Sequence, residues 1–296
     1  MSDRSGPAQP AASSADLARR FGGVARLYGG PAQARFAAAH AVVVGIGGVG
    51  SWAAEALARS AVGRLTLVDL DHIAESNTNR QIHALGAAYG RAKVDAMAER
   101  IRAINPAAQV QTVEDFVTPD NAAELLGRLQ PVDVVVDCID QVQAKAALLA
   151  QCRRLGVLVV TCGAAGGRLD PTRLRSDDLA RAQGDPLLAK LRYRLRRQHG
   201  FPAEAAGRVR KFGISAVFSD EPVRRPLAAE CAVDLRGADT GQAAAAPQGL
   251  SCAGYGSAVT VTAPLGFAAA AVALRLLASG CAAAPAPGAR AAAATA

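Results

Sequence analysis

The chain has 296 residues, 51% of them hydrophobic, and a formal net charge of +8. This length can hold one large or two small domains with a real core. The positive charge suits a polyanionic partner such as nucleic acid, although an Arg- and Ala-rich composition explains it equally well. The six cysteines form no C-x-x-C pair and have no histidine at ligand spacing, which argues against structural zinc. No basic-then-apolar segment opens the chain, so we expect a reducing, cytoplasmic setting.

Composition divides the chain into four parts. Residues 1–15 are mostly Ser, Pro, Ala and Gly and predict a disordered tail. Residues 16–167 predict an α/β domain, 168–280 a C-terminal α/β extension with a mobile loop at 228–249, and 281–296 a second disordered tail.

The elements alternate along the first domain. Residues 16–30 predict a helical turn followed by a glycine-containing arm, and 31–39 a helix that leads into the first strand. Apolar runs predict strands at 41–45, 65–69, 132–138, 157–162 and 214–218, and residues 110–113 predict a further short strand. Helical periodicity predicts helices at 51–60, 91–104, 118–129 and 143–155. This order predicts a Rossmann-like, doubly wound and mostly parallel sheet.

The last apolar segment, residues 258–278, resembles a membrane span in composition. Its uncharged part has about 17 positions, which is marginal for a bilayer, and it contains Pro264 and Gly266. We therefore expect a buried or interface helix, and association with a membrane is the less favoured alternative.

The first strand leads into the glycine turn GIGGVG. Gly45, Gly47 and Gly50 fit the pattern G-x-G-x-x-G, and Asp69 follows the next strand at the distance expected of a ribose ligand. A phosphate would lie on the free amides at the N-terminus of the following helix. These residues alone predict a nucleotide site and would suit an NAD-dependent dehydrogenase.

Three later features favour a triphosphate instead. A polar loop, Ser76 to Gln81, contains Arg80, and Lys93 begins the next predicted helix. Asp140 follows the strand at 132–138, at the sheet edge where open α/β folds bind ligands. Two cations and a carboxylate around a phosphate turn suit ATP with Mg²⁺, because they can neutralise charge as pyrophosphate leaves.

The motifs GIGGVG, VDLD, SNTNRQ, AK and DCID together resemble the ubiquitin-activating-enzyme-like superfamily, which includes the thiamin and molybdopterin adenylyltransferases. The resemblance covers about residues 20–165 and implies a homodimer that adenylates carboxylates with Mg-ATP. It implies that Gly45, Gly47 and Gly48 contact ATP, that Asp69 binds the ribose, that Asp71, Asn77, Arg80 and Lys93 hold the phosphates, and that Asp140 coordinates Mg²⁺. It also implies an arginine that reaches the partner subunit's ATP, for which Arg26 is the matching position and Arg20 a weaker one.

Further segments, among them RFGGVARLYG, NTNRQIHAL, GAAGGRLDPT and DPLLAKLRYRLR, are similar to one branch of this family, the tRNA threonylcarbamoyladenosine dehydratases. That resemblance implies ATP-dependent cyclisation of N6-threonylcarbamoyladenosine 3′ to the anticodon, through an acyl-AMP. The tRNA backbone would lie on the basic residues Lys190, Arg192, Arg194, Arg196, Arg197, Arg208, Arg210 and Lys211.

Two other outcomes of the same resemblance stay open. An adenylyltransferase for a ubiquitin-like sulfur-carrier protein would share the ATP site, and a non-catalytic scaffold for sulfur-transfer proteins would share the fold. Cys252 matches a family cysteine, so a cysteine desulfurase or sulfur acceptor could be a partner and Cys252 a reactive thiol. A small buried side chain is the alternative role of this cysteine.

Overall fold

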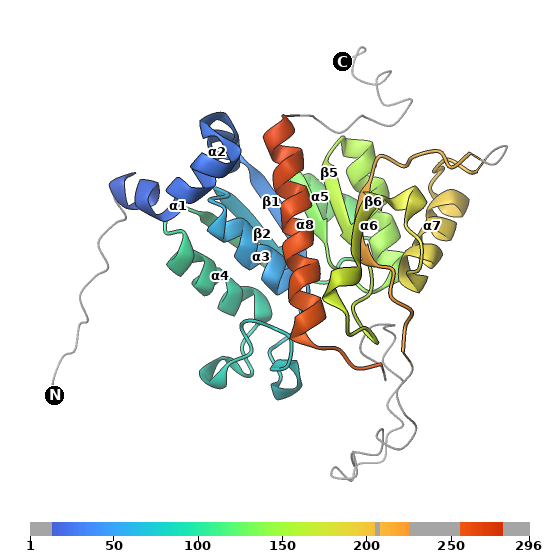
Figure 1. Cartoon of the computed structure of the whole chain (residues 1–296), viewed down its shortest axis with the longest axis horizontal. Coiled ribbons are helices and arrows are strands. Elements are labelled where there is room, and N and C mark those ends of the chain that lie inside the picture. The colour runs from blue at the N-terminus through green and yellow to red at the C-terminus, as the bar shows by residue number, and fades with distance from the viewer. Residues whose placement is uncertain (1–13, 205–207, 225–254, 281–296) are drawn as a thin grey trace, which may run out of the picture.

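A computed structural model describes residues 14–204, 208–224 and 255–280. Its centre is a seven-stranded sheet of order β3-β2-β1-β4-β5-β7-β6 (Figure 1). The strands are β1 His40–Val44, β2 Arg64–Val68, β3 Gln109–Val113, β4 Val134–Asp137, β5 Leu158–Cys162, β6 Leu174–Asp178 and β7 Ser215–Ser219. Neighbouring strands are parallel except β6 and β7, which are antiparallel. The prediction of a doubly wound, mostly parallel sheet is confirmed.

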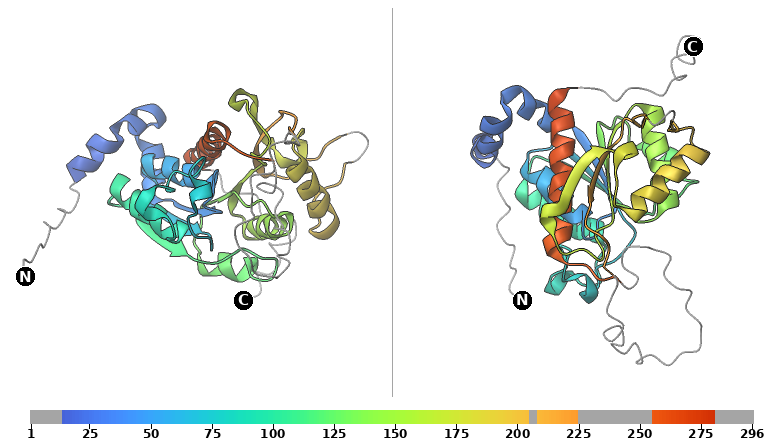
Figure 2. Two further views of the ribbon diagram at one scale, coloured as in Figure 1. Left: turned by 90° about the horizontal axis from the view of Figure 1, so that it is seen from below. Right: turned by 45° about the vertical axis from the view of Figure 1, so that its right-hand side comes forward.

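Helices cover both faces of this sheet. The helices are α1 Ser14–Tyr28, α2 Gly30–Ala38, α3 Gly50–Arg59, α4 Lys93–Ile104, α5 Ala122–Arg128, α6 Val142–Leu155, α7 Pro186–Gln198 and α8 Val259–Ser279, with short 3₁₀ turns at Glu75–Asn77, Gly86–Ala88, Pro171–Arg173 and Leu179–Arg181. Buried residues of α2, α3, α4 and α8 share one core cluster, and those of α5, α6 and α7 share another. The left view of Figure 2 shows α8 on one side of the sheet and the green α5 and α6 on the other.

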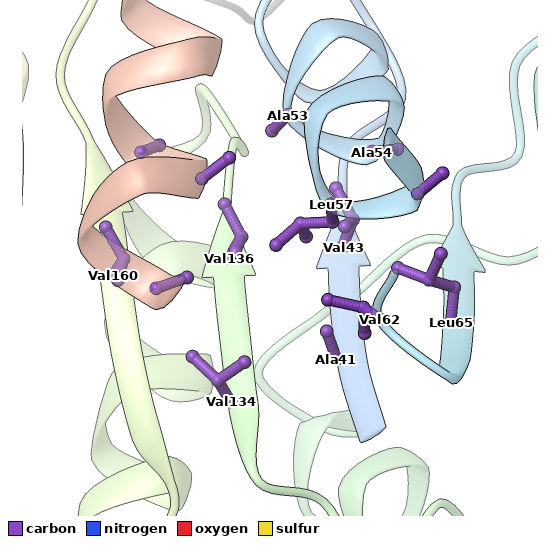
Figure 3. Packing of buried hydrophobic residues seen from close by; sticks show 14 of the residues in the cluster. Ala41, Val43, Ala53, Ala54, Leu57, Val62, Leu65, Val134, Val136 and Val160 are labelled. Carbon is purple, nitrogen blue, oxygen red and sulfur yellow. The ribbon is translucent and has the colours of Figure 1, made fainter. Parts of the chain in front are cut away.

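Strand β1 contributes to both cores because successive side chains of a strand point to opposite faces. Ala41 and Val43 lie in the cluster with α3 and α8 (Figure 3), whereas Val42 and Val44 lie in the cluster with α5 and α6. Every residue of β1 is buried. This burial on both faces explains the continuous apolar run that marked the strand in the sequence.

Helix α8 is the apolar segment expected from the sequence, and it packs against α3 and the sheet. Among the described residues it is the one helix long and apolar enough to cross a membrane, with a mean hydropathy of 1.8, yet 61% of that stretch is buried inside the protein. Gly266 permits its close approach to α3, because a Cβ there would lie 3.0 Å from the Cβ of Trp52. The expectation of a buried helix is confirmed.

Two local expectations were wrong, and one strand was missed. Residues 16–30 form no arm, because α1 continues through Gly22 and Gly23 to Tyr28. Helix α5 begins only at Ala122, after a turn closed by hydrogen bonds between Thr118 and Asn121. Strand β6 was not expected, because its exposed LRSDD sequence lacks an apolar run. Both predicted tails (apart from Ser14 and Ala15), the loop at 228–249 and Cys252 lie outside the described residues.

Candidate active site

A cavity of about 590 Å³ opens at the carboxyl ends of β1, β2, β4 and β5. Ligands bind at this edge in open α/β sheets. The predicted nucleotide-site residues all line it: Gly45, Gly47, Gly48, Asp69, Asp71, Asn77, Arg80, Lys93 and Asp140. Arg26 is not among the lining residues and lies exposed in the last turn of α1.

The glycine turn brings backbone amides to the cavity wall. Gly45 has φ +85°, a left-handed conformation that side chains rarely adopt. A Cβ on Gly50 would collide with the carbonyl oxygen of Gly45, so the turn can close only around glycine. Helix α3 begins at Gly50 with its N-terminus toward the cavity, which is the arrangement that holds phosphate groups.

Asp69 joins this turn to the end of β2. Its carboxylate accepts hydrogen bonds from the amides of Ile46 at 2.6 Å and Asp71 at 2.8 Å. Burial raises the pKa of Asp69, and the nearby Lys93 opposes that effect. The carboxylate therefore fixes the backbone around the cavity, in addition to the ribose contact predicted from the sequence.

Cationic side chains form the next part of the wall. The Lys93 ammonium lies 2.6 Å from a carboxylate oxygen of Asp71, and its side chain is 7% exposed. Arg80 donates to the carbonyl of Ser76 at 2.9 Å and to the side chain of Asn79 at 2.8 Å. Asn77 holds the same loop by accepting from the amide of Ala74 at 3.1 Å.

Helix α8 and the residues just before it also contribute to this wall. The indole of Trp52 donates to the carbonyl of Arg80 at 2.9 Å, and the Thr262 hydroxyl of α8 lies 3.5 Å from the same oxygen. Sequence reasoning missed several lining residues that come from distant segments: Asp115, Phe116, Ser257 and Thr262. No local motif marks them, because packing of far-apart segments brings them together.

A buried ion pair supports the loop that carries Asp140. The Lys145 ammonium lies 2.8 Å from Asp137, both side chains are 0% exposed, and Lys145 also donates to the carbonyl of Ile139 at 3.0 Å. Asp137 accepts from the Thr161 hydroxyl at 2.7 Å and from the Ile139 amide at 3.1 Å. Sequence reasoning missed this pair, although a carboxylate inside an apolar strand signals a buried partner.

A second buried ion pair connects the cavity wall to α7. Arg168 lies 3.0 Å from Asp185, and both side chains are 0% exposed. Asp185 accepts from the amide of Ala164, a lining residue, at 3.0 Å and caps α7 by accepting from Leu188 at 2.9 Å. The N-terminus of α7 is therefore fixed to the wall of the cavity.

The cations of the predicted basic segment differ in their exposure to solvent. Lys190 and Arg197 are exposed on α7, as are Arg208, Arg210 and Lys211 further on. Arg196 instead pairs with Glu204 at 3.2 Å and lies over the ring of Phe212. Arg192 is half-buried, and burial lowers its pKa.

Among the described cysteines, one lines the cavity. Cys138 lines it, and its sulfur lies 3.8 Å from that of Cys162 on the neighbouring strand. The hydrogen bond between the two thiols raises the pKa of Cys138 well above its usual range, and burial acts in the same direction. Because the thiolate is the reactive form, Cys138 is poorly suited to act as a nucleophile.

Residues 22–289 match the ThiF family, and the chain belongs to it. It is 49% identical over 252 residues to the tRNA threonylcarbamoyladenosine dehydratase of Escherichia coli, covering 85% of this chain and 90% of that one. Molybdopterin-synthase adenylyltransferase of Haemophilus influenzae is 32% identical over 129 residues, 44% of this chain and 52% of that one. The crystal structure of the E. coli dehydratase TcdA in complex with ATP superposes with a TM-score of 0.77 at 46% identity, covering 90% of this chain and 97% of that one.

Proposed function

We propose that this protein uses ATP to cyclise N6-threonylcarbamoyladenosine in tRNA, with net loss of one water. The assembly of the glycine turn, Arg80, Lys93 and Asp140 around one cavity is the observation that carries the ATP-dependent chemistry. Similarity to the E. coli dehydratase over most of both chains supports tRNA as the substrate.

In the proposed first step the threonyl carboxylate attacks the α-phosphorus of ATP. An acyl–phosphate bond forms, the α–β phosphoanhydride bond breaks and pyrophosphate leaves. Negative charge increases on the leaving group, where Arg80 and Lys93 can stabilise it. The amides of the glycine turn and the N-terminus of α3 hold the remaining phosphate.

In the second step the carbamoyl group of the same modified base attacks the activated carbonyl carbon. The carbamoyl group gives up one proton as the ring closes, the carbon–oxygen bond to the phosphate breaks, and AMP leaves with the former carboxylate oxygen. The nucleophile belongs to the substrate, so no enzyme thioester is needed. The raised pKa of Cys138 agrees with this mechanism.

Mg²⁺ fits this site through Asp140. Magnesium in nucleotide enzymes is commonly bound by one or two carboxylates together with phosphates and water. Asp140 lines the cavity just after β4, the neighbour of β1, and the backbone of Cys138 and Ile139 before it lies against Gly45 of the glycine turn that would hold the phosphates. The metal, when bound, would offset the negative charge of the triphosphate.

The nearest rival is adenylation of a sulfur-carrier protein, and one experiment separates the two. The protein is incubated with ATP, Mg²⁺ and tRNA that carries the linear modification, and the nucleosides are analysed by mass spectrometry. We expect loss of one water from the modified nucleoside. An unchanged nucleoside, with AMP transferred to a small carrier protein, would favour the rival.

Asp140→Ala should lower this conversion by at least about 100-fold, because the charge of the triphosphate loses its partner. Circular dichroism and the thermal midpoint should stay near the wild-type values, since Asp140 lies in a loop at the cavity rather than in the core. Asp120→Ala, an exposed carboxylate outside the cavity, is the matched control. Wild-type conversion by Asp140→Ala would remove Asp140 from the metal site.

We also propose a homodimer in which Arg26 acts in the partner subunit's cavity. Arg26 and the 78% exposed Leu27 lie on the surface of α1, away from the residues that line their own cavity. A 1:1 mixture of Arg26→Ala and Asp140→Ala subunits that exchange freely should regain about a quarter of wild-type activity, because about half of the dimers are mixed and each of these has one complete cavity of two. Activity that stays at the level of either single variant would place Arg26 outside the site.

A sulfur-transfer partner at Cys252 and a cytoplasmic location remain predictions of the sequence. Capture of a cysteine desulfurase by the wild-type chain, and its loss in Cys252→Ser, would test the first. Fractionation of cells that produce the chain would test the second.

A further inference from the structure

One face of α7 carries a basic–aromatic–basic stripe, defined by Lys190, Tyr193 and Arg197. Spacings of three and four residues place these side chains next to one another on a helix surface. The opposite face holds the leucines that anchor the helix in the core: Leu188, Leu191 and Leu195. The stripe therefore points away from the protein.

Tyr193 has no packing role that would explain an aromatic residue here. Its side chain is 64% exposed, although burying such a ring is normally favourable. Its one described ring contact is with Arg197, whose guanidinium lies 5.7 Å from the ring centre. An exposed ring between two cations is the arrangement on which proteins stack the bases of single-stranded nucleic acid.

The stripe is held at a fixed distance from the cavity. Leu187, in the first turn of α7, lines the cavity, and the Asp185 cap is fixed by Arg168 and by the amide of Ala164. At 1.5 Å per residue, Tyr193 lies about 9 Å further along the helix axis than Leu187. Figure 1 shows α7 against α6 at the side of the sheet, with no helix drawn over its outer surface.

We propose that Tyr193 stacks on an unpaired base of the RNA substrate close to the reacting adenosine, and that Lys190 and Arg197 contact the flanking phosphates. The inference rests on the proposed function for the identity of the RNA. It adds a sequence-tolerant stacking contact to the backbone contacts predicted from charge. Stacking is insensitive to salt, whereas each phosphate contact releases counterions.

The test measures binding of tRNA that carries the linear modification to the full-length chain over a series of salt concentrations. Tyr193→Ala should weaken binding by about 5- to 150-fold, the range found for loss of one base–aromatic stack. The slope of log K against log salt should not change. Tyr193→Phe keeps the ring and should bind within about twofold of wild type, since stacking needs no hydroxyl.

Lys190→Gln is the matched variant for charge. It should weaken binding and reduce the salt slope by about 0.7 to 0.9, as expected for one lost phosphate contact. Wild-type affinity in Tyr193→Ala would overturn the stacking role, and so would an equal loss in Tyr193→Phe. A stripe that binds another protein would leave the RNA affinity of all three variants unchanged.

Failure of the inference is distinguishable from failure of the proposed function. Wild-type protein that binds and dehydrates the tRNA, together with unchanged binding by Tyr193→Ala, rejects only the stack. Wild-type protein that binds the tRNA without dehydrating it rejects the proposed reaction, while the affinity of Tyr193→Ala still decides the stack. Absence of RNA binding by the wild type overturns both.

Discussion

Two lysine–aspartate pairs lie at the same edge of the sheet and differ in their access to the cavity. Lys93 begins α4 and pairs with Asp71 just after β2, and the Asp71 side chain is 54% exposed. Lys145 lies in the first turns of α6 and pairs with Asp137 at the end of β4, and both side chains are 0% exposed. The residue types and the strand-to-helix arrangement are the same.

Exposure gives the two pairs different roles. If a phosphate takes the place of Asp71 beside Lys93, the released carboxylate can be hydrated, so the exchange leaves no buried charge. If Lys145 moved away, Asp137 would remain charged inside the core, which is strongly unfavourable. We infer that Lys93 is free to change partner during the reaction, whereas Lys145 fixes the loop that presents Asp140.

The largest effect is expected from a substitution that breaks the buried pair of Lys145 and Asp137. Lys145→Met should lower the free energy of unfolding by about 3–5 kcal/mol, because Asp137 loses its partner in the core. Chemical denaturation of wild type and variant measures the difference. The double variant Asp137→Asn/Lys145→Met should recover part of the loss, since no unpaired charge remains and Asn can still accept from Ile139. A Lys145→Met protein as stable as wild type would show that this pair does not hold the structure.

Breaking the exposed pair, Lys93 with Asp71, should instead lower activity and change stability little. Lys93→Met should reduce kcat/KM for tRNA dehydration by about 10²- to 10³-fold, as for loss of one preorganised charge at a reaction centre. The unfolding free energy should change by less than about 1 kcal/mol, because the Asp71 carboxylate is left half in solvent. Arg128→Met, which removes an exposed cation paired with Glu124 outside the cavity, is the control. A large loss of stability with intact turnover would exchange the roles of the two lysines.

The sequence predicted the half of the cavity that local motifs encode. The glycine turn, Asp69, the loop with Arg80, Lys93 and Asp140 follow successive strands, and parallel strands bring their carboxyl ends to one edge. Six of the seven strands were predicted, five of them from apolar runs and β3 as a short strand between two predicted helices. The exposed strand β6 lies at the edge of the described sheet, beside β7, and has no such run.

The other half depends on contacts between distant segments, and periodicity cannot encode these. The pairing of Lys145 with Asp137 required knowledge of how α6 lies on β4, and that of Arg168 with Asp185 required the place of α7. The basic segment shows the same limit. Five cations on α7 looked equivalent in sequence, yet the helix directs Lys190 and Arg197 outward and Arg192 and Arg196 partly inward.

The smallest expected effect is on the pH dependence of stability, and it compares the two lysines through the buried His83. Burial lowers the pKa of His83 to about 4, and the charges of Lys93 and Arg100 act in the same direction. His83 is therefore harder to protonate in the folded protein than in the unfolded chain. Its contribution to the free energy of unfolding is fully present above pH 6.5. That support is lost as pH falls from 6.5 toward 4, by up to about 3 kcal/mol.

His83→Gln should therefore show a flatter decrease in unfolding free energy between pH 7 and pH 4.5 than the wild type. Subtraction of the two curves removes contributions shared by both proteins, such as that of Asp69. Lys93→Met should raise the pKa of His83, since one opposing charge is gone, and so move the lower end of the acid limb to higher pH by a fraction of a unit and reduce the total loss. Lys145 is not among the charges that act on His83. Its replacement in the Asp137→Asn background should therefore leave the position of that limb unchanged. Equal shifts for both lysines would mean that the two pairs share one electrostatic environment, contrary to the difference in exposure on which their separate roles rest.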